Sequence, residues 1–171
     1  MEGVENLEDD LVAMWKIKRL IKNIGDMRGS GTSMITMYIP PKKDAMNKAN
    51  KKLSDEESAA ANIKSSVNKA GVLTAITSIR EKLRLYKSVP ENGLCLFCGT
   101  VDQEGKDTGK KFTMDFQPFK PITAQTYHCD SKFDLAPLEA MLVTEKKFGF
   151  IIIDGHGTLF ATLQGNNKEV L

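Results

Sequence analysis

The feature that most constrains this fold is a short polar segment between two amphipathic helical patterns. The segment, residues 59–65, has the sequence Ala-Ala-Ala-Asn-Ile-Lys-Ser. The pattern before it spans about 44–58, and the pattern after it begins at Ser65 or Ser66, either of which can cap a helix. Two helical patterns joined this closely indicate a helical hairpin, and residues 59–65, called the tip segment below, are predicted to form its tip.

The tip segment carries groups that suit single-stranded RNA. Its three alanines allow a backbone or a flat ligand to come close, Asn62 offers both a donor and an acceptor, and Lys64 offers a mobile charge. Ile63 is free either to anchor the segment inward or to contact a base. Exposed base edges and phosphates are read by such groups. The alternative is a hairpin cap, in which Asn62 and Ser65 only satisfy backbone groups.

The remaining pattern predicts an α/β layered domain, with a mixed central β-sheet covered by helices and the helical hairpin projecting from it. An amphipathic helix ends near Gly29, and its stripe of Met and Trp15 is expected in the core. Residues 148–153 are continuously apolar, as in a strand buried on both faces. Other strands are expected at 34–39, 94–98, 111–116, 126–129 and 158–163, with a short helix at 135–142. The second hairpin helix is expected to pack through Val67, Ala70, Leu73, Ile76, Ile79, Leu83 and Tyr86.

Composition limits the classes of partner. Lys and Arg exceed Asp and Glu by 24 − 22 = 2, so the overall charge does not indicate a nucleic-acid binder. No apolar run reaches the ~20 residues of a membrane span, so no membrane partner is expected. Three cysteines without a secretory signal predict reduced thiols and a cytoplasmic location. Lysines near the hairpin form either a basic face that steers RNA or a solvated surface: Lys42, Lys43, Lys48, Lys51, Lys52, Lys64 and Lys69.

Catalytic and metal-binding interpretations find little support. Cys95 and Cys98, with His128 and Cys129, have a nominal zinc-ligand pattern. In a strand, however, residues three apart or adjacent point to opposite faces. The same alternation separates a Cys129 nucleophile from a His128 base, and His156 lies in a separate turn. We therefore expect no catalytic residue, metal or cofactor.

Four further residues offer groups that can recognise bases. Tyr127 supplies a ring for stacking and a hydroxyl, and stacking is worth roughly 1–3 kcal/mol per base. Thr32 donates or accepts, Glu56 only accepts, and Cys129 is a small, soft contact. Each also has an ordinary structural role available. Glu56, for example, is placed to form an i,i+4 ion pair with Lys52.

Three motifs together resemble the N-terminal domain of eukaryotic class I translation termination factors, or release factors. They are Asn-Ile-Lys-Ser at 62–65, Tyr-His-Cys-Asp-Ser-Lys-Phe at 127–133 and Gly-Thr-Ser at 31–33. The resemblance continues through 14–18, 115–121 and 148–164, so it covers nearly the whole chain in order. It implies a domain that enters the ribosomal decoding site and contacts the mRNA stop codon and small-subunit ribosomal RNA.

The resemblance also assigns roles to residues. The loop for the initial uridine is formed by Asn62, Ile63, Lys64 and Ser65, of which the lysine is open to hydroxylation. The purines that follow are read or accommodated by Glu56, Thr32, Tyr127 and Cys129. Gly31 and Ser33 shape the loop that carries Thr32, and support for the strand segment comes from Asp130, Lys132 and Phe133.

The family's remaining functions are not expected of this chain. It has no Gly-Gly-Gln, the motif that promotes peptidyl-tRNA hydrolysis, and it lacks the C-terminal region that binds the class II release-factor GTPase. Residues 166–171 look like the start of a helix cut short. We therefore expect residues 1–171 to be a single N-terminal codon-recognition domain of a longer protein, monomeric and without hydrolytic activity.

Four positions depart from the common family pattern. Ala59 and Ala61 replace Thr and Ser, so two hydroxyls near the codon are absent; His128 replaces Leu, and Ser131 replaces Asn. A lost hydrogen bond in a desolvated site costs about 1–3 kcal/mol, enough to alter discrimination between adenine and guanine. We expect restricted codon use, with UAA and UAG retained and UGA weakened. The alternative function is a generic single-stranded-RNA-binding or ribosome-docking module without codon discrimination.

Overall fold

The computed structural model describes residues 2–29, 31–102, 109–142, 147–155, 157–164 and 167–170. In chain order its elements are α1 (Glu2–Gly25), β1 (Met34–Ile39), α2 (Ala45–Ala60), α3 (Ser66–Leu83), β2 (Leu94–Val101), β3 (Lys110–Phe116), β4 (Thr126–Asp130), α4 (Ala136–Met141), β5 (Lys147–Asp154), β6 (Gly157–Gln164) and β7 (Asn167–Val170). The predicted hairpin is confirmed as α2 and α3, and every predicted strand has a counterpart. Most of the hairpin loop predicted between Asp102 and Gly109 lies outside the described residues, and so does His156.

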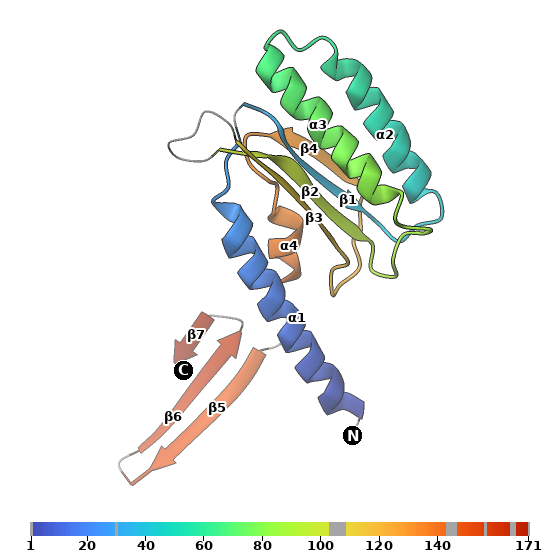
Figure 1. The fold of residues 1–171 in the computed structure, drawn as a ribbon. Helices are drawn as coiled ribbons and strands as arrows, with labels where there is room; N and C mark the ends of the chain where they lie inside the picture. Colours follow the sequence, from blue (N-terminus) through green and yellow to red (C-terminus); the bar gives the residue numbers. More distant parts are fainter. Residues whose placement is uncertain are drawn as a thin grey trace.

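The central sheet has four strands in the order β3-β2-β1-β4, and each neighbouring pair is antiparallel. The α/β layered fold is confirmed, with α2 and α3 over one face of the sheet and α1 and α4 on the other (Figure 1). The expectation of a mixed sheet was wrong. A single crossover helix returns the chain to start a parallel strand, but here two helices lie between β1 and β2. The second helix carries the chain back to the edge of the sheet where β1 ends. Strand β2 therefore starts beside the end of β1 and runs antiparallel to it.

Strand β1 lies at the centre of two apolar cores. Ile35, Met37 and Ile39 belong to a cluster with α2, α3 and β2, here called the hairpin-side cluster. Met34 and Tyr38 belong to a second cluster with α1, α4 and Phe133, here called the α1-side cluster. All six residues of β1 are buried. This alternation of side chains places the two faces of one strand against different helices.

In its first turns, α3 does not bury the residues that were predicted to pack. Val67 and Ala70 are exposed, Val67 at 70%. Burial begins later in the helix, with Val72, Ala75, Ile76, Ile79 and Leu83. The first turn of α3 lies at the projecting end of the hairpin (Figure 1), where the sheet offers no surface for it to pack on.

Helix α1 also differs from its prediction. It spans Glu2–Gly25 and so ends before Gly29, near which its end was predicted. Trp15 is 58% exposed and stacks with Arg19, whose guanidinium carbon is 5.4 Å from the ring centroid. The expected core position of Trp15 was therefore wrong. Among the helix residues whose burial is described, Ile17 and Ile24 are buried and belong to the α1-side cluster.

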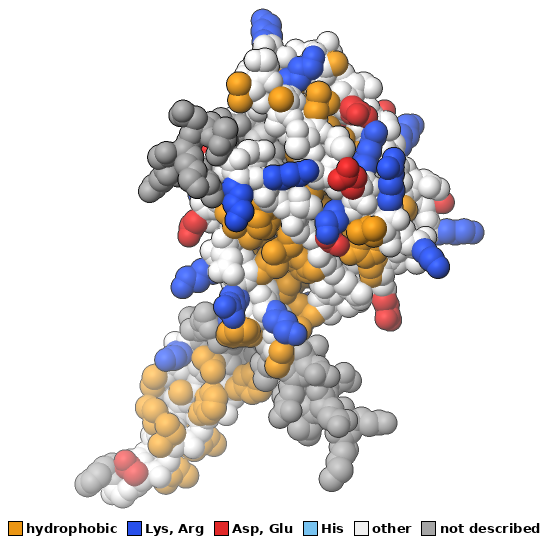
Figure 2. Space-filling view, in the orientation of Figure 1, with side chains coloured by type: hydrophobic (Ala, Val, Ile, Leu, Met, Phe, Trp, Pro, Cys, Tyr) orange, Lys and Arg blue, Asp and Glu red, His pale blue; other side chains and the backbone are white. Residues whose placement is uncertain are grey.

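Strands β5, β6 and β7 form a separate three-stranded antiparallel sheet. The expected burial of residues 148–153 on both faces was wrong, since Ile151 is 64% and Ile153 74% exposed. Apolar side chains cover the visible surface of this sheet in Figure 2. The predicted terminal helix is also wrong, because Asn167–Val170 is a strand that pairs with β6. Among the described residues, no helix has the length and apolar character that a membrane crossing needs.

The structure predicts unequal reactivity for the three thiols. Cys95 and Cys98 are buried on opposite faces of β2, where burial raises their pKa values to about 12 and about 11. The thiolate is the reactive form, so at pH 8 iodoacetamide should modify the half-buried Cys129 first. Mass spectrometry of timed samples measures this, and a urea-denatured sample, in which all three react, is the control. Equal labelling of Cys95 in the folded chain would contradict the packing.

Candidate functional site

Residues from three distant segments meet beside the N-terminal end of α3. Thr32 lies just before β1, Cys129 lies in β4, and Asn68 lies in the first turn of α3. The Cys129 thiol donates to the Thr32 carbonyl oxygen at 3.1 Å, and the Asn68 side-chain amide donates to the Thr32 hydroxyl at 3.1 Å. Antiparallel pairing of β1 and β4, with Ile35 opposite Cys129, sets the first of these contacts. Thr32 is thereby held from both sides, although it is exposed.

The loop that carries Thr32, residues 31–33 and here called the Thr32 loop, depends on two close approaches. Gly31 has a φ of +67°, a conformation that costs a residue with a side chain about 1–2 kcal/mol. A Cβ at Gly31 would also lie 2.9 Å from Asn68 Oδ1. Ser33 is buried, and a Cβ at Gly71 of α3 would lie 2.9 Å from the Ser33 Cβ. Both glycines therefore allow α3 to lie directly against the loop.

Tyr127 and Glu56 extend the site along α2. The Lys52 amine forms an ion pair with Glu56 at 2.6 Å and lies 5.5 Å from the centroid of the Tyr127 ring. The predicted Lys52–Glu56 pair is thus confirmed. The ring of Tyr127 packs against the hairpin-side cluster, so its stacking surface is partly used by the core. Its position brings an aromatic ring, a carboxylate and an amine onto one surface.

Burial keeps the site's weak acids protonated. Desolvation is the largest cause that raises the pKa of the Tyr127 phenol, followed by the nearby Cys129 and Glu56 groups. Desolvation likewise raises the pKa of the Cys129 thiol. The Tyr127 hydroxyl is buried and makes no hydrogen bond of good geometry with the described residues. At neutral pH the phenol and the thiol are therefore both neutral, the thiol proton is donated to the Thr32 carbonyl, and the Cys129 thiol is not activated as a nucleophile.

The tip segment presents its polar side chains outward. Asn62 and Lys64 are exposed, whereas Ile63 is half-buried and packs against the hairpin-side cluster. Of the two roles left open for Ile63, the structure shows the inward anchor. The Ser65 hydroxyl accepts from the backbone N–H of Asn68 at 3.3 Å, which confirms Ser65 as the helix cap. The Lys69 amine donates to the carbonyl of Ala61 at 2.8 Å and so closes the turn.

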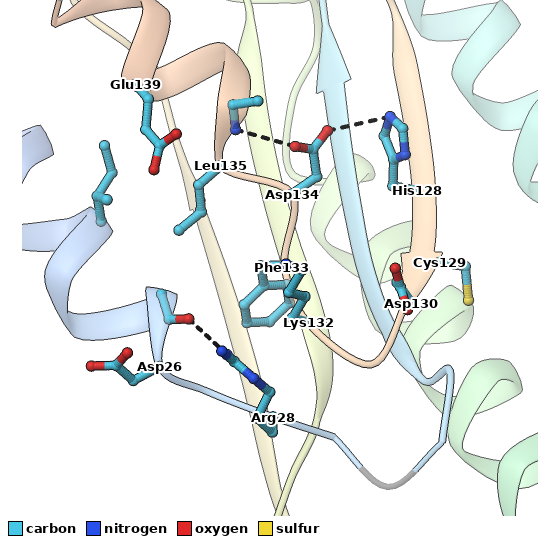
Figure 3. Close-up of a pocket in the computed structure, with 13 residues that line it drawn as sticks. Asp26, Arg28, His128, Cys129, Asp130, Lys132, Phe133, Asp134, Leu135 and Glu139 are labelled. Atoms are coloured by element: carbon cyan, nitrogen blue, oxygen red, sulfur yellow. Dashed lines mark hydrogen bonds and ion pairs between the residues drawn. The ribbon is translucent and has the colours of Figure 1, made fainter.

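The second half of the 127–133 motif lies on the other face of the sheet. Phe133 is buried in the α1-side cluster. The imidazole Nε2 of His128 is 3.3 Å from Asp134 Oδ2, as Figure 3 shows. His128, Asp130, Lys132 and Phe133 line a cavity of about 600 Å³ with the end of α1. The structure therefore does not join His128 to Tyr127, because neighbouring residues of β4 face opposite ways.

The other predicted site residues differ in their structural roles. Asp130 accepts from the backbone N–H of Ser131 at 2.6 Å, which shapes the turn after β4. Ala59 and Ala61 are exposed at the tip, so neither is required by the core. Asn68 was not predicted. An asparagine three residues after the Ser65 cap was its only sequence signal, and its contact with Thr32 spans 36 residues.

The comparisons with known proteins agree on one family. The family model described as "eRF1 domain 1" matches residues 12–143. The "Eukaryotic peptide chain release factor subunit 1" proteins of Stylonychia lemnae and Oxytricha trifallax are each 52% identical over 160 residues, which is 94% of this chain. The chain covers 36% of each relative, about a third of its length.

Solved structures show the same fold. The structure titled "Crystal structure of archaeal translation termination factor, aRF1" has a TM-score of 0.69 and 28% identity, and the match covers 92% of this chain and 43% of that one. A second structure, titled "Archaeal protein", has a TM-score of 0.71 and 30% identity over 92% of this chain and 44% of that one.

Replacing Gly31 should destabilise the Thr32 loop and the fold. We expect Gly31→Ala to lower the free energy of unfolding by at least about 1 kcal/mol, because of its positive φ and the contact with Asn68. Urea denaturation measures this. Gly25→Ala is the matched control, since its Cβ would lie 3.6 Å from a Leu135 methyl, an ordinary contact. Equal stability of the two variants would show that the loop conformation is not constrained as described.

Proposed function

This chain belongs to the eRF1 domain 1 family, and on that basis we propose that it recognises mRNA stop codons in the ribosomal decoding site during translation termination. The observation that carries the proposal is the convergence of Thr32, Glu56, Tyr127 and Cys129 next to the tip segment. These residues come from three separate parts of the chain.

The chemistry of the site supports recognition of bases. Asn62 and Lys64 are exposed at the tip and suit a uridine edge and a phosphate. The Glu56 carboxylate accepts hydrogen bonds and suits a purine amino group, and the Thr32 hydroxyl supplies both functions. The Tyr127 hydroxyl is protonated and lies buried beside Cys129, where it makes no hydrogen bond of good geometry with the described residues. Ile63 holds the tip in place in this proposal, since it is anchored in the core.

The proposal assigns recognition, and not hydrolysis, to this chain. The Cys129 thiol is protonated and the His128 imidazole lies on the far face of β4, so these two described residues do not form a nucleophile and base pair. Peptidyl-tRNA hydrolysis and contact with the class II release-factor GTPase belong, in this proposal, to further domains of a longer protein. The partners of residues 1–171 are then mRNA and small-subunit ribosomal RNA in the cytoplasm, bound by one monomeric N-terminal domain.

Restricted codon use is the finer part of the proposal. Exposed Ala59 and Ala61 remove two hydroxyls from the tip, and fewer donors reduce the means of distinguishing adenine from guanine. We propose that UAA and UAG are retained and UGA is weakened. His128 does not enter this argument, because its imidazole lies beside Asp134 on the other face of the sheet.

A chimera tests the proposed function directly. The chain replaces the matching 160-residue region of the Stylonychia lemnae relative, and peptide release is measured on ribosomes with UAA, UAG, UGA or a sense codon in the decoding site. Release is expected on stop codons and not on the sense codon, with UGA weakest. If a folded, ribosome-bound chimera gives no stop-dependent release, the docking-module alternative holds. Equal release on all three stop codons rejects the restriction alone.

Phenylalanine substitutions at two tyrosines should have opposite effects on stability and on peptide release. Tyr127→Phe should leave stability equal or higher, since a buried hydroxyl without a hydrogen bond of good geometry costs about 1–3 kcal/mol. It should lower stop-dependent release about tenfold, because the proposal has this hydroxyl turn toward the codon on binding. The Tyr86 hydroxyl donates to Asp115 Oδ2. Tyr86→Phe should therefore lower the unfolding free energy by about 1–2 kcal/mol and leave release by the folded protein unchanged. Urea denaturation and the release assay separate the two effects.

The result that counts against codon reading is equally specific. If Tyr127→Phe gives normal release on every stop codon, its hydroxyl does not contact the codon. Glu56→Gln then provides a second check, because it keeps the shape of the side chain while removing the charge and one acceptor oxygen. Normal release by both variants would leave the site without a role in discrimination.

A further inference from the structure

Asn68 connects the two codon-reading loops of the proposed function. Its backbone N–H donates to the Ser65 hydroxyl at the end of the tip segment, at 3.3 Å. Its side-chain amide donates to the Thr32 hydroxyl at 3.1 Å. We propose that Asn68 is a positioning residue that fixes the Thr32 loop relative to the tip segment and sets the direction of the Thr32 hydroxyl proton. This inference rests on the proposed function.

The contact between Asn68 and the loop is close as well as polar. A Cβ added to Gly31 would lie 2.9 Å from Asn68 Oδ1 and 3.1 Å from Cγ, so the amide lies flat against the loop backbone. The loop can neither move toward α3 nor carry a side chain at this point. Its other side is held by the Cys129 thiol through the Thr32 carbonyl. Asn68 therefore supplies the contact that relates this loop to the hairpin, whereas Cys129 relates it to the sheet.

An unpaired atom argues against a purely stabilising role. Asn68 Oδ1 is buried and finds no hydrogen-bond partner among the described residues. A buried acceptor without a partner is destabilising, and an apolar side chain of the same shape would avoid that cost. An asparagine selected only for stability is poorly explained at this position. Its donor to Thr32 is the feature that a leucine would lack.

The donor has a chemical consequence for Thr32. A hydroxyl carries one proton and two lone pairs. Because one lone pair accepts from Asn68, the Thr32 proton is directed elsewhere, and the hydroxyl is exposed. Toward a ligand, the Thr32 hydroxyl therefore acts mainly as a hydrogen-bond donor. It suits acceptor atoms on a purine edge, such as N7 or the O6 of guanine, more than an amino group.

Three substitutions at Asn68 separate shape, donor and proton direction. In the chimera, Asn68→Leu keeps the approximate shape and removes the donor, so the concentration for half-maximal stop-dependent release should rise about tenfold, the effect of one hydrogen bond, with little change in maximal rate. Asn68→Asp offers only acceptors, so Thr32 must donate to it, and the increase should be larger. Asn68→Ser keeps a shorter donor and should recover part of the loss. Asn47→Leu, at an exposed position of α2, is the matched control and should behave as the unsubstituted chimera.

A double-substitution cycle tests whether Asn68 acts through Thr32. Thr32→Val combined with Asn68→Leu should be no worse than Thr32→Val alone, because the same interaction is removed in each. Independent, additive losses would overturn the proposal. So would a normal half-maximal concentration for Asn68→Leu. Urea denaturation measures the effect on stability. Asn68→Leu should be at least as stable as the unsubstituted chain. A loss of stability large enough to explain the loss of release would assign Asn68 a structural role only.

Hydrogen exchange of the chain alone distinguishes this inference from the proposed function. The amides of Thr32 and Ser33 should exchange at least several-fold faster in Asn68→Leu than in the unsubstituted chain or in Asn47→Leu. Unchanged exchange would overturn the positioning role even if the chimera reads stop codons. Conversely, faster exchange with no stop-dependent release by any chimera would retain the connection between the loops and reject the proposed function.

Discussion

The burial of β1 on both faces is the constraint on which the rest of the domain depends. All six residues of this strand are buried, and its two neighbours, β2 and β4, take their register from it. Its alternate side chains place the helical hairpin on one face and α1 on the other. Because Thr32 directly precedes β1 and Cys129 lies opposite Ile35, the same strand also brings the Thr32 loop to β4. Core packing and site geometry are therefore set by one element.

Local patterns in the sequence predicted the elements and several contacts of the site. The hairpin, the Ser65 cap and the Lys52–Glu56 ion pair follow from residues within a few positions of one another. The 62–65, 127–133 and 31–33 motifs indicated the family, which the comparisons confirm. The physical reason is that helix caps and i,i+4 pairs are decided by the chain's own neighbours, so no knowledge of the tertiary fold is needed.

The predictions that failed concern which parts of the chain pack against a given side chain. Trp15 and Val67 are apolar residues on helices, yet both are exposed because they lie on faces that no layer of the described residues covers. Residues 148–153 have the pattern of a buried strand, but no other layer of the described residues covers β5. Asn68 was missed for the complementary reason, since its partner Thr32 is 36 residues away. Periodicity identifies an apolar face but does not identify what will cover it.

The character of the site follows from desolvation more than from charge. With a formal net charge of +2, the chain has little long-range attraction for a polyanion, and sequence-independent affinity for RNA comes mainly from such charge. Tyr127 and Cys129 are neutral at physiological pH at their ordinary pKa values, and burial raises those pKa values further. Neutral donors and acceptors contribute through geometry, and a mismatched partner leaves them unpaired at a cost. A surface of this kind discriminates between ligands better than it attracts them.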